Sequence, residues 1–196
     1  MIRPAFVIVS GPPASGKTTL ARPLARALGL PLFEKDTIKE RLANCLGEGQ
    51  REYSRSLGLA AVLMLVDIAG ELLAAGQSVM LESYFHHGKA EQQLGPLTSK
   101  ANSVLIHCTA SRETLIDRYG LRMSSPGRHA IHEVGQRVDD LRARPEREVD
   151  KPLDLAIPRL IVSTSASFPD AAEIAPVVHR RLGDHLPQQA VMEHWP

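Results

Sequence analysis

The chain has 196 residues and a mass of 21.4 kDa, a size typical of one domain around one hydrophobic core. Its 23 Lys and Arg residues nearly balance 22 Asp and Glu residues, which excludes the strongly basic field of a protein that coats nucleic acid. Hydrophobic residues make up 43% of the chain and charged residues 23%, which excludes overall disorder.

The cysteines and the apolar segments of the sequence allow a prediction of the cellular compartment. Cys45 and Cys108 share no metal-ligand or disulfide-framework spacing, so we expect a reducing compartment, the cytoplasm. The first residues do not form a signal-peptide pattern. The longest apolar stretch, Leu57 to Val66, is well short of the roughly 20 residues of a membrane span. We therefore predict a buried core helix there and no membrane partner.

The chain begins with a pattern that predicts a strand, a loop and a helix. Residues 5–10 (AFVIVS) are almost all apolar, as in a fully buried strand. A glycine-bounded loop follows. From Lys17 to Leu28 apolar residues recur at helical spacing, and Gly29 and Pro31 then end the helix.

The rest of the chain alternates between strands and helices. The predicted elements are, in order, an extended piece at 31–34, helices at 36–46 and 54–75, strands at 78–82 and 103–109, helices at 112–121 and 132–148, a strand at 159–164 and a helix at 171–182. This alternation predicts an α/β three-layer sandwich with a five-stranded, mostly parallel sheet. We expect one domain over 1–186, with a lid near 118–135 and a loosely held tail over 187–196.

A phosphate-binding motif follows the first predicted strand. Residues 11–18 (GPPASGKT) match G-x-x-x-x-G-K-[ST] in the strand-to-helix context that this pattern requires. Backbone N–H groups of such a loop surround an anion at the positive end of the next helix. Lys17 adds a cation, and Thr18 offers a hydroxyl to Mg²⁺. We therefore expect ATP with Mg²⁺ to contact Gly11, Pro12, Pro13, Ala14, Ser15, Gly16, Lys17, Thr18 and Thr19. ATP is favoured over GTP because no N-K-x-D sequence is present.

Asp36 follows the second predicted strand, at the sheet edge where ligands of α/β proteins bind. Its carboxylate could accept the proton of an acceptor hydroxyl that attacks the γ-phosphate, or it could help hold the metal ion. It could also simply be the N-cap or a first-turn acid of its helix. The residues alone leave these roles open.

The segment GPPASGKTTLARPLARALGLPLFEKDTIKERL resembles the opening of the small P-loop kinases grouped with zeta toxins, polynucleotide 5′-kinases and chloramphenicol phosphotransferase. The resemblance spans most of the chain and implies an adenylate-kinase-like fold with a small helical lid. It also implies that Asp36 is the general base and that Lys39 helps to bind the acceptor. Polynucleotide kinases resemble this pattern with Arg in place of Lys39, which weakens the case for a nucleic-acid acceptor.

The resemblance also places two residues at the end of the strand over 78–82. Related kinases have an acidic or small polar residue at the position of Glu82, near the metal ion or the acceptor. Tyr84, in the segment that follows, would line the acceptor pocket by its position. The adjacent histidines in this segment point in different directions, which argues against a metal site between them.

Three arginines lie between residues 118 and 132, with no acidic residue among them. Arg118 and Arg122 are four residues apart and therefore lie on one helical face. Guanidinium groups stabilise the charge on a transferring phosphoryl group. The segment resembles the kinase lid, which implies that Arg118 packs on adenine and that Arg122 and Arg128 reach the phosphates. Thr164, after the last strand, is placed at the adenine edge by the same resemblance.

The lid segment RHAIH, residues 128–132, resembles an R-H-P-G-H signature with Ala130 and Ile131 in place of Pro-Gly. His129 and His132 lack a third ligand nearby, which argues against zinc. Ser124–Gly127 (SSPG) would then supply the turn of the lid.

These patterns together predict an ATP- and Mg²⁺-dependent kinase that transfers the γ-phosphate to a hydroxyl of a small molecule. Its catalytic residues would be Lys17, Asp36, Arg122 and Arg128. A polynucleotide 5′-hydroxyl kinase, a nucleotide-sugar kinase and an ATP-binding regulatory protein with slow hydrolysis remain alternatives. Residues 1–33 carry four basic residues and no acid, so this segment and the basic lid are expected to meet around a polyphosphate. The acceptor and the oligomeric state stay open.

Overall fold

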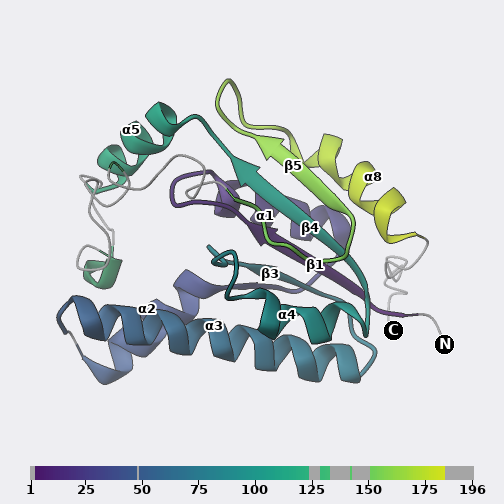
Figure 1. Ribbon diagram of the computed structural model, residues 1–196, viewed down its shortest axis with the longest axis horizontal. Helices are drawn as coiled ribbons and strands as arrows, with labels where there is room; N and C mark the ends of the chain where they lie inside the picture. The colour runs from purple at the N-terminus through teal and green to yellow at the C-terminus, as the bar shows by residue number, and fades with distance from the viewer. Residues whose placement is uncertain (1–2, 48, 124–128, 133–141, 143–150, 184–196) are drawn as a thin grey trace, which may run out of the picture.

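The computed structural model describes residues 3–47, 49–123, 129–132, 142 and 151–183. Five parallel strands form one sheet in the order β2-β3-β1-β4-β5. Helices cover both faces of this sheet (Figure 1), which confirms the predicted three-layer α/β sandwich. The strands are β1 (Ala5–Ser10), β2 (Leu32–Glu34), β3 (Val79–Glu82), β4 (Asn102–Thr109) and β5 (Arg159–Ser163). The helices are α1 (Lys17–Leu28), α2 (Lys35–Leu46), α3 (Arg51–Ala74), α4 (Glu91–Thr98), α5 (Arg112–Met123) and α8 (Ala171–Leu182), with a 3-10 turn η1 (Ala130–His132).

The central strand β1 is buried on both faces, because helices pack on either side of the sheet. Its residues Val7 and Val9 belong to the core under α1 and α8. Its residues Phe6 and Ile8 belong to the second core, which α3 and α4 cover. A strand buried on both faces needs apolar residues at successive positions, which explains the uninterrupted run AFVIV.

The parallel register brings the chemistry-bearing segments to one edge of the sheet. Val9 pairs with Glu82 across β1 and β3, and Glu34 pairs with the same Glu82 across β2 and β3. The carboxyl ends of these three strands therefore lie side by side. The loops that follow them meet at this edge, which is where ligands of open α/β sheets bind.

Most predicted elements agree with the structure within three residues, and those over 5–10, 17–28 and 171–182 agree at both ends. Helix α4 was not predicted, because it contains Gly95 and Pro96, two residue types that disfavour helix. Burial of Leu94 and Leu97 in the second core stabilises it nevertheless. The predicted helix over 132–148 falls almost entirely outside the described residues. So do the predicted turn at 124–127 and the tail, and the predicted domain limits stay a prediction.

Helix α3 corrects one expectation. The segment from Leu57 to Val66 was predicted to be buried, but Leu59 is 58% exposed and Leu63 is 42% exposed. Only one side of α3 packs on the core, through residues such as Leu65, while the other side faces outward. Its 24 residues, with a mean hydropathy of 2.1 in the most apolar window, would be long and apolar enough to cross a membrane. Core helices pass the same test, so the predicted cytoplasmic location stays a prediction.

Candidate active site

The loop after β1 has the backbone conformation of an anion-binding loop. Gly11 has a φ of +139°, and a Cβ atom there would overlap the carbonyl oxygen of Cys108. Ala14 has a φ of +65°, which is uncommon for a residue other than glycine. Gly16, with a φ of +80°, is the N-cap of α1. The N-terminus of α1 therefore opens directly onto the loop, where its free N–H groups favour a negative charge.

Lys17 lies inside this loop and is buried. Its Nζ donates a hydrogen bond to the carbonyl oxygen of Pro12, at 2.8 Å. Burial lowers the pKa of this lysine, while the nearby Glu82 carboxylate opposes that effect. The ammonium group is therefore held at the position where the phosphate-binding motif places a cation, next to an acid that partly compensates its charge.

Thr18 and Glu82, two predicted Mg²⁺ ligands, are in contact. The Thr18 hydroxyl donates to Glu82 Oε2 at 3.0 Å. Glu82 is 4% exposed, and burial raises the pKa of its carboxyl group, with a further rise from Asp36. A divalent cation would compensate this buried negative charge. The pair fits Mg²⁺, which binds through one or two protein carboxylates and substrate phosphates and needs no larger protein cluster.

Asp36 lies in the first turn of α2. This helix follows β2, which is the neighbour of the strand that ends in Glu82. The N-cap of α2 is Glu34, so Asp36 is the first-turn acid and not the cap. Its Oδ1 lies 2.8 Å from the Nζ of Lys35. Partial burial would raise the pKa of Asp36, but the charge of Lys35 and its hydrogen bond to this carboxylate outweigh that effect and hold the pKa below its usual range. The carboxylate is therefore ionised at neutral pH, and its side chain is half exposed.

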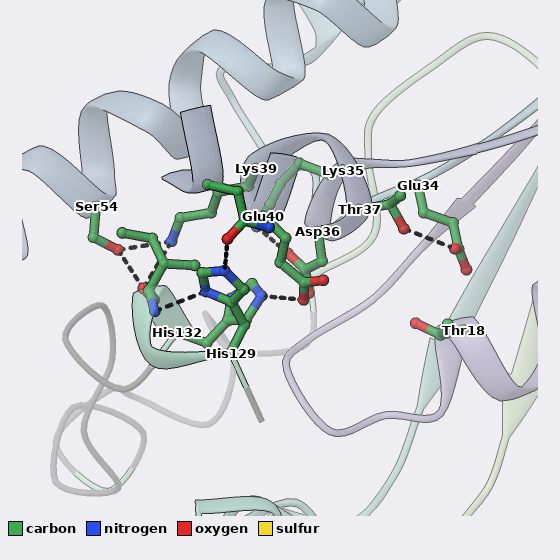
Figure 2. Close-up of polar contacts among 12 residues, drawn as sticks. Thr18, Glu34, Lys35, Asp36, Thr37, Lys39, Glu40, Ser54, His129 and His132 are labelled. Carbon is green, nitrogen blue, oxygen red and sulfur yellow. Dashed lines mark hydrogen bonds and ion pairs between the residues drawn. The ribbon is translucent and has the colours of Figure 1, made fainter. Parts of the chain in front are cut away.

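Lys39 lines the same cleft but is buried. Its Nζ donates to Ser54 Oγ at 2.7 Å and to the carbonyl oxygen of Ile131 at 3.4 Å. Ser54 Oγ also donates to Ile131, at 2.8 Å (Figure 2). Lys39 thus joins α2, α3 and η1. Its predicted contact with the acceptor stays a prediction.

The two lid histidines contact α2, which sequence reasoning missed. His132 Nε2 lies 2.8 Å from Glu40 Oε1, and His129 Nε2 lies 3.1 Å from Asn44 Oδ1. Glu40 and Asn44 follow Asp36 at steps of four residues, so all three share one face of α2. Figure 2 shows both imidazoles beside this face. The H-x-x-H spacing therefore places both histidines against one helix, and the prediction that they bind no metal ion stays a prediction.

Arg118 and Thr164, both predicted near adenine, contact each other. Arg118 donates to Thr164 Oγ1 at 2.9 Å and to its carbonyl oxygen at 2.6 Å. The Arg118 guanidinium carbon also lies 4.7 Å from the ring centroid of Phe168. Phe168, on the loop after β5, was missed because a single aromatic residue in a loop carries no motif. Its ring lies against Gly16, at the start of α1.

One cleft connects these groups. It has a volume of about 1340 Å³ and is larger than the roughly 300–1,000 Å³ of a site for one small ligand, so it has room for a nucleotide and an acceptor. Its lining includes predicted site residues from four segments of the chain: Pro13, Ala14, Gly16, Lys17, Thr18, Thr19, Asp36, Lys39, Glu82, Tyr84, Arg118 and Arg122. Gly11, Pro12, Ser15 and Thr164 are not part of the lining. Arg128 lies outside the described residues.

Comparison with known proteins shows the family of this chain. Residues 6–147 match the family model AAA_33, described as an AAA domain. The cytidylate kinase of Pyrobaculum arsenaticum is 31% identical over 172 residues, which cover 86% of this chain and 89% of that protein. The shikimate kinase of Synechococcus sp. is 31% identical over 96 residues, covering 44% of this chain and 51% of that one.

Solved structures show the same fold. A protein of Chloroflexus aurantiacus assigned as a kinase superposes with a TM-score of 0.84 and 35% identity, and the match covers 92% of this chain and all of that one. The family match extends over more than half of the chain, from β1 beyond α5. With relatives that are named kinases, it shows that this chain belongs to the AAA_33 family and is a P-loop kinase.

Proposed function

We propose that this P-loop kinase transfers the γ-phosphate of ATP to a hydroxyl group of a small molecule, with Asp36 as the general base. The observation that carries this proposal is the position of Asp36. It lies at the carboxyl end of β2, in the cleft that the phosphate-binding loop lines, and neighbouring cations keep it ionised. An ionised carboxylate beside the transferred phosphate suits a hydroxyl acceptor, whose proton must leave.

In the proposed step the acceptor oxygen attacks the γ-phosphorus and a new O–P bond forms. The bond from the γ-phosphorus to the β–γ bridging oxygen breaks, and ADP leaves with that electron pair. The hydroxyl proton passes to the carboxylate of Asp36. Because the side chain of Asp36 is half exposed and its pKa is low, it can release this proton to water after transfer.

The other cleft residues would hold the donor and stabilise its charge. Lys17 would contact the β- and γ-phosphates, and Arg122, on α5, would add positive charge near the transferred group. Thr18 and Glu82 would hold Mg²⁺, which would neutralise negative charge on the phosphates when bound. Asp36, whose charge raises the pKa of Glu82, could contribute to the same metal site.

The test is a screen of hydroxyl compounds with [γ-³²P]ATP, using the whole chain and Asp36→Asn. We expect a labelled product whose rate of formation falls by about 10²- to 10⁴-fold in Asp36→Asn, the usual contribution of a general base. The affinity for ATP should not change. Asp67→Asn, an exposed carboxylate on α3, is the matched control and should retain the full rate.

Two results would reject this proposal. The first is a labelled product that Asp36→Asn forms as fast as the unaltered chain. The second is that none of the hydroxyl compounds accepts phosphate while ATP hydrolysis continues unchanged in Asp36→Asn. That outcome would favour a nucleotide-binding regulatory protein.

A second candidate acceptor is the phosphate of a nucleoside monophosphate. The similarity to cytidylate kinase over 86% of the chain favours it. A phosphate oxygen carries no proton that must leave at neutral pH, so transfer to CMP would proceed without a general base. Transfer to CMP that survives Asp36→Asn would identify this activity.

A further inference from the structure

The cleft has an excess of positive charge. Among the residues that the structure describes, nine lysines and arginines line it, against two carboxylates, Asp36 and Glu82. ATP accounts for those that lie at the phosphate-binding loop and the lid. The other six come from α1, α2, α3 and the segment after β3.

Most of these cations already have partners within the protein. Lys35 pairs with Asp36, and Arg22 pairs with Glu34 at 2.9 Å. Arg118 is bonded to Thr164, and Lys39 to Ser54. These four side chains therefore stabilise contacts between segments of the protein itself.

Arg55 and Lys89 differ from these. Both line the cleft and both are exposed. Across the described part of the chain, neither side chain forms an ion pair or a hydrogen bond. Two unpaired cations in one cleft are a binding feature for an anion, provided that they lie on facing elements.

The two residues come from different walls of the cleft. Arg55 lies on α3, on the helical face that also contributes Ser54, Gly58, Leu59 and Val62 to the lining. Lys89 lies in the segment between β3 and α4, whose residues Phe85 and Ala90 line the cleft as well, together with Gln93 of α4. Each wall thus combines an exposed cation, Arg55 or Lys89, with small or apolar residues, and the α3 wall also includes Arg51.

We propose that the acceptor is an anion, a carboxylate or a phosphate ester, and that Arg55 and Lys89 bind its charged group. This inference rests on the proposed function, because it concerns the acceptor of that reaction. Asp36 and Glu82 repel a negative charge close to the transferred phosphate, so the anionic group must lie away from them. Arg55 and Lys89 offer that place, and the reacting oxygen then remains near Asp36.

The test measures binding, so it does not depend on turnover. The whole chain is saturated with Mg²⁺ and a non-hydrolysable ATP analogue and titrated calorimetrically with three pairs of probes. They are shikimate and its methyl ester, gluconate and glucose, and CMP and cytidine. In at least one pair we expect the anion to bind at least tenfold more tightly than its neutral partner. A preference within the shikimate or gluconate pair would indicate a carboxylate, and a preference within the CMP pair would indicate a phosphate ester.

Variants assign the preference to the two residues. Arg55→Gln and Lys89→Gln should each weaken binding of that anion by about three- to tenfold, and neither should change the affinity for the ATP analogue. Arg180→Gln removes an exposed arginine of α8, outside the cleft lining, and should change neither affinity.

The inference is overturned if no anion binds better than its neutral partner, or if the preference persists in both glutamine variants. It is also overturned if a neutral compound is phosphorylated at a rate that these variants do not alter. Failure of the proposed function looks different. In that case an anion binds with the expected dependence on Arg55 and Lys89, yet no label passes to it from [γ-³²P]ATP.

Discussion

His132 Nε2 lies 2.8 Å from Glu40 Oε1, and this contact joins the lid turn η1 to the helix that carries Asp36. The His132 side chain is 14% exposed, and burial lowers its pKa although Asp36 and Glu40 both oppose the shift. The neutral imidazole can donate through Nε2 to Glu40. The lid segment therefore contacts α2 four residues from the candidate base.

This contact predicts a pH dependence of stability. Because the pKa of His132 is lower in the folded chain than the unfolded value of 6.5, the unfolded chain binds the proton more readily. Folding stability is therefore intact above that pH and declines as the pH falls through 6.5. His132→Gln should lose less stability than the unaltered chain between pH 7.5 and pH 5.5, measured by urea unfolding. An equal loss in both proteins would contradict the prediction.

Ser54 is expected to contribute more to stability than its neighbour Ser56. Ser54→Ala removes the 2.7 Å acceptor of the buried Lys39 ammonium and the 2.8 Å bond to Ile131. Loss of a partner for a buried charged group should lower the free energy of unfolding by roughly 1–3 kcal/mol. In Ser56→Ala, the control, only a bond from an exposed hydroxyl to the carbonyl of Glu52 is lost, so stability should hardly change. Equal effects in denaturant titrations would show that Lys39 does not depend on Ser54.

Alanine variants of Gly11 and Gly29 would distinguish the energetic cost of backbone strain from that of steric overlap. Both have positive φ, so alanine at either position should cost about 1–2 kcal/mol of stability. A Cβ atom at Gly29 would have no neighbour within 4 Å, whereas one at Gly11 would overlap the Cys108 carbonyl. Gly11→Ala should therefore destabilise the chain further and abolish ATP binding. Gly29→Ala should leave ATP affinity unchanged, and calorimetric titration would reveal any deviation.

The contact of Arg118 with Phe168 predicts a change in nucleotide affinity. If adenine packs here, Phe168→Ala should weaken binding of ATP several-fold, since contacts between cations and aromatic rings contribute roughly 0.5–2 kcal/mol. Inorganic tripolyphosphate, which has no base, is the control ligand, and its affinity should stay the same. A parallel loss for both ligands would instead indicate that Phe168 acts through Gly16 and the phosphate-binding loop.

The sequence by itself determined the sheet and the phosphate-binding loop. Both depend on local patterns, namely apolar runs buried on two faces and glycines that permit positive φ, as at Gly11 and Gly16. It also placed Asp36 after the second strand, and parallel strands then brought it to the same edge as Glu82. Helix α4 escaped prediction because burial of Leu94 and Leu97 outweighs the local preferences of Gly95 and Pro96.

Only the tertiary structure decided what each polar side chain contacts. Local patterns cannot reveal that Lys39 is bonded to Ser54 and Ile131, or that Arg118 meets Phe168, because these partners are far apart in the chain. The local distribution of charge is likewise decided by the tertiary structure. Residue counts give an almost neutral protein, whereas folding brings nine cations and two carboxylates to the lining of one cleft, as far as the described residues show. Which of those cations stay unpaired depends on distances across the fold. Arg55, Lys89 and Arg122 form no ion pair or hydrogen bond within the described residues, and of these Arg55 and Lys89 lie outside the phosphate-binding loop and the lid.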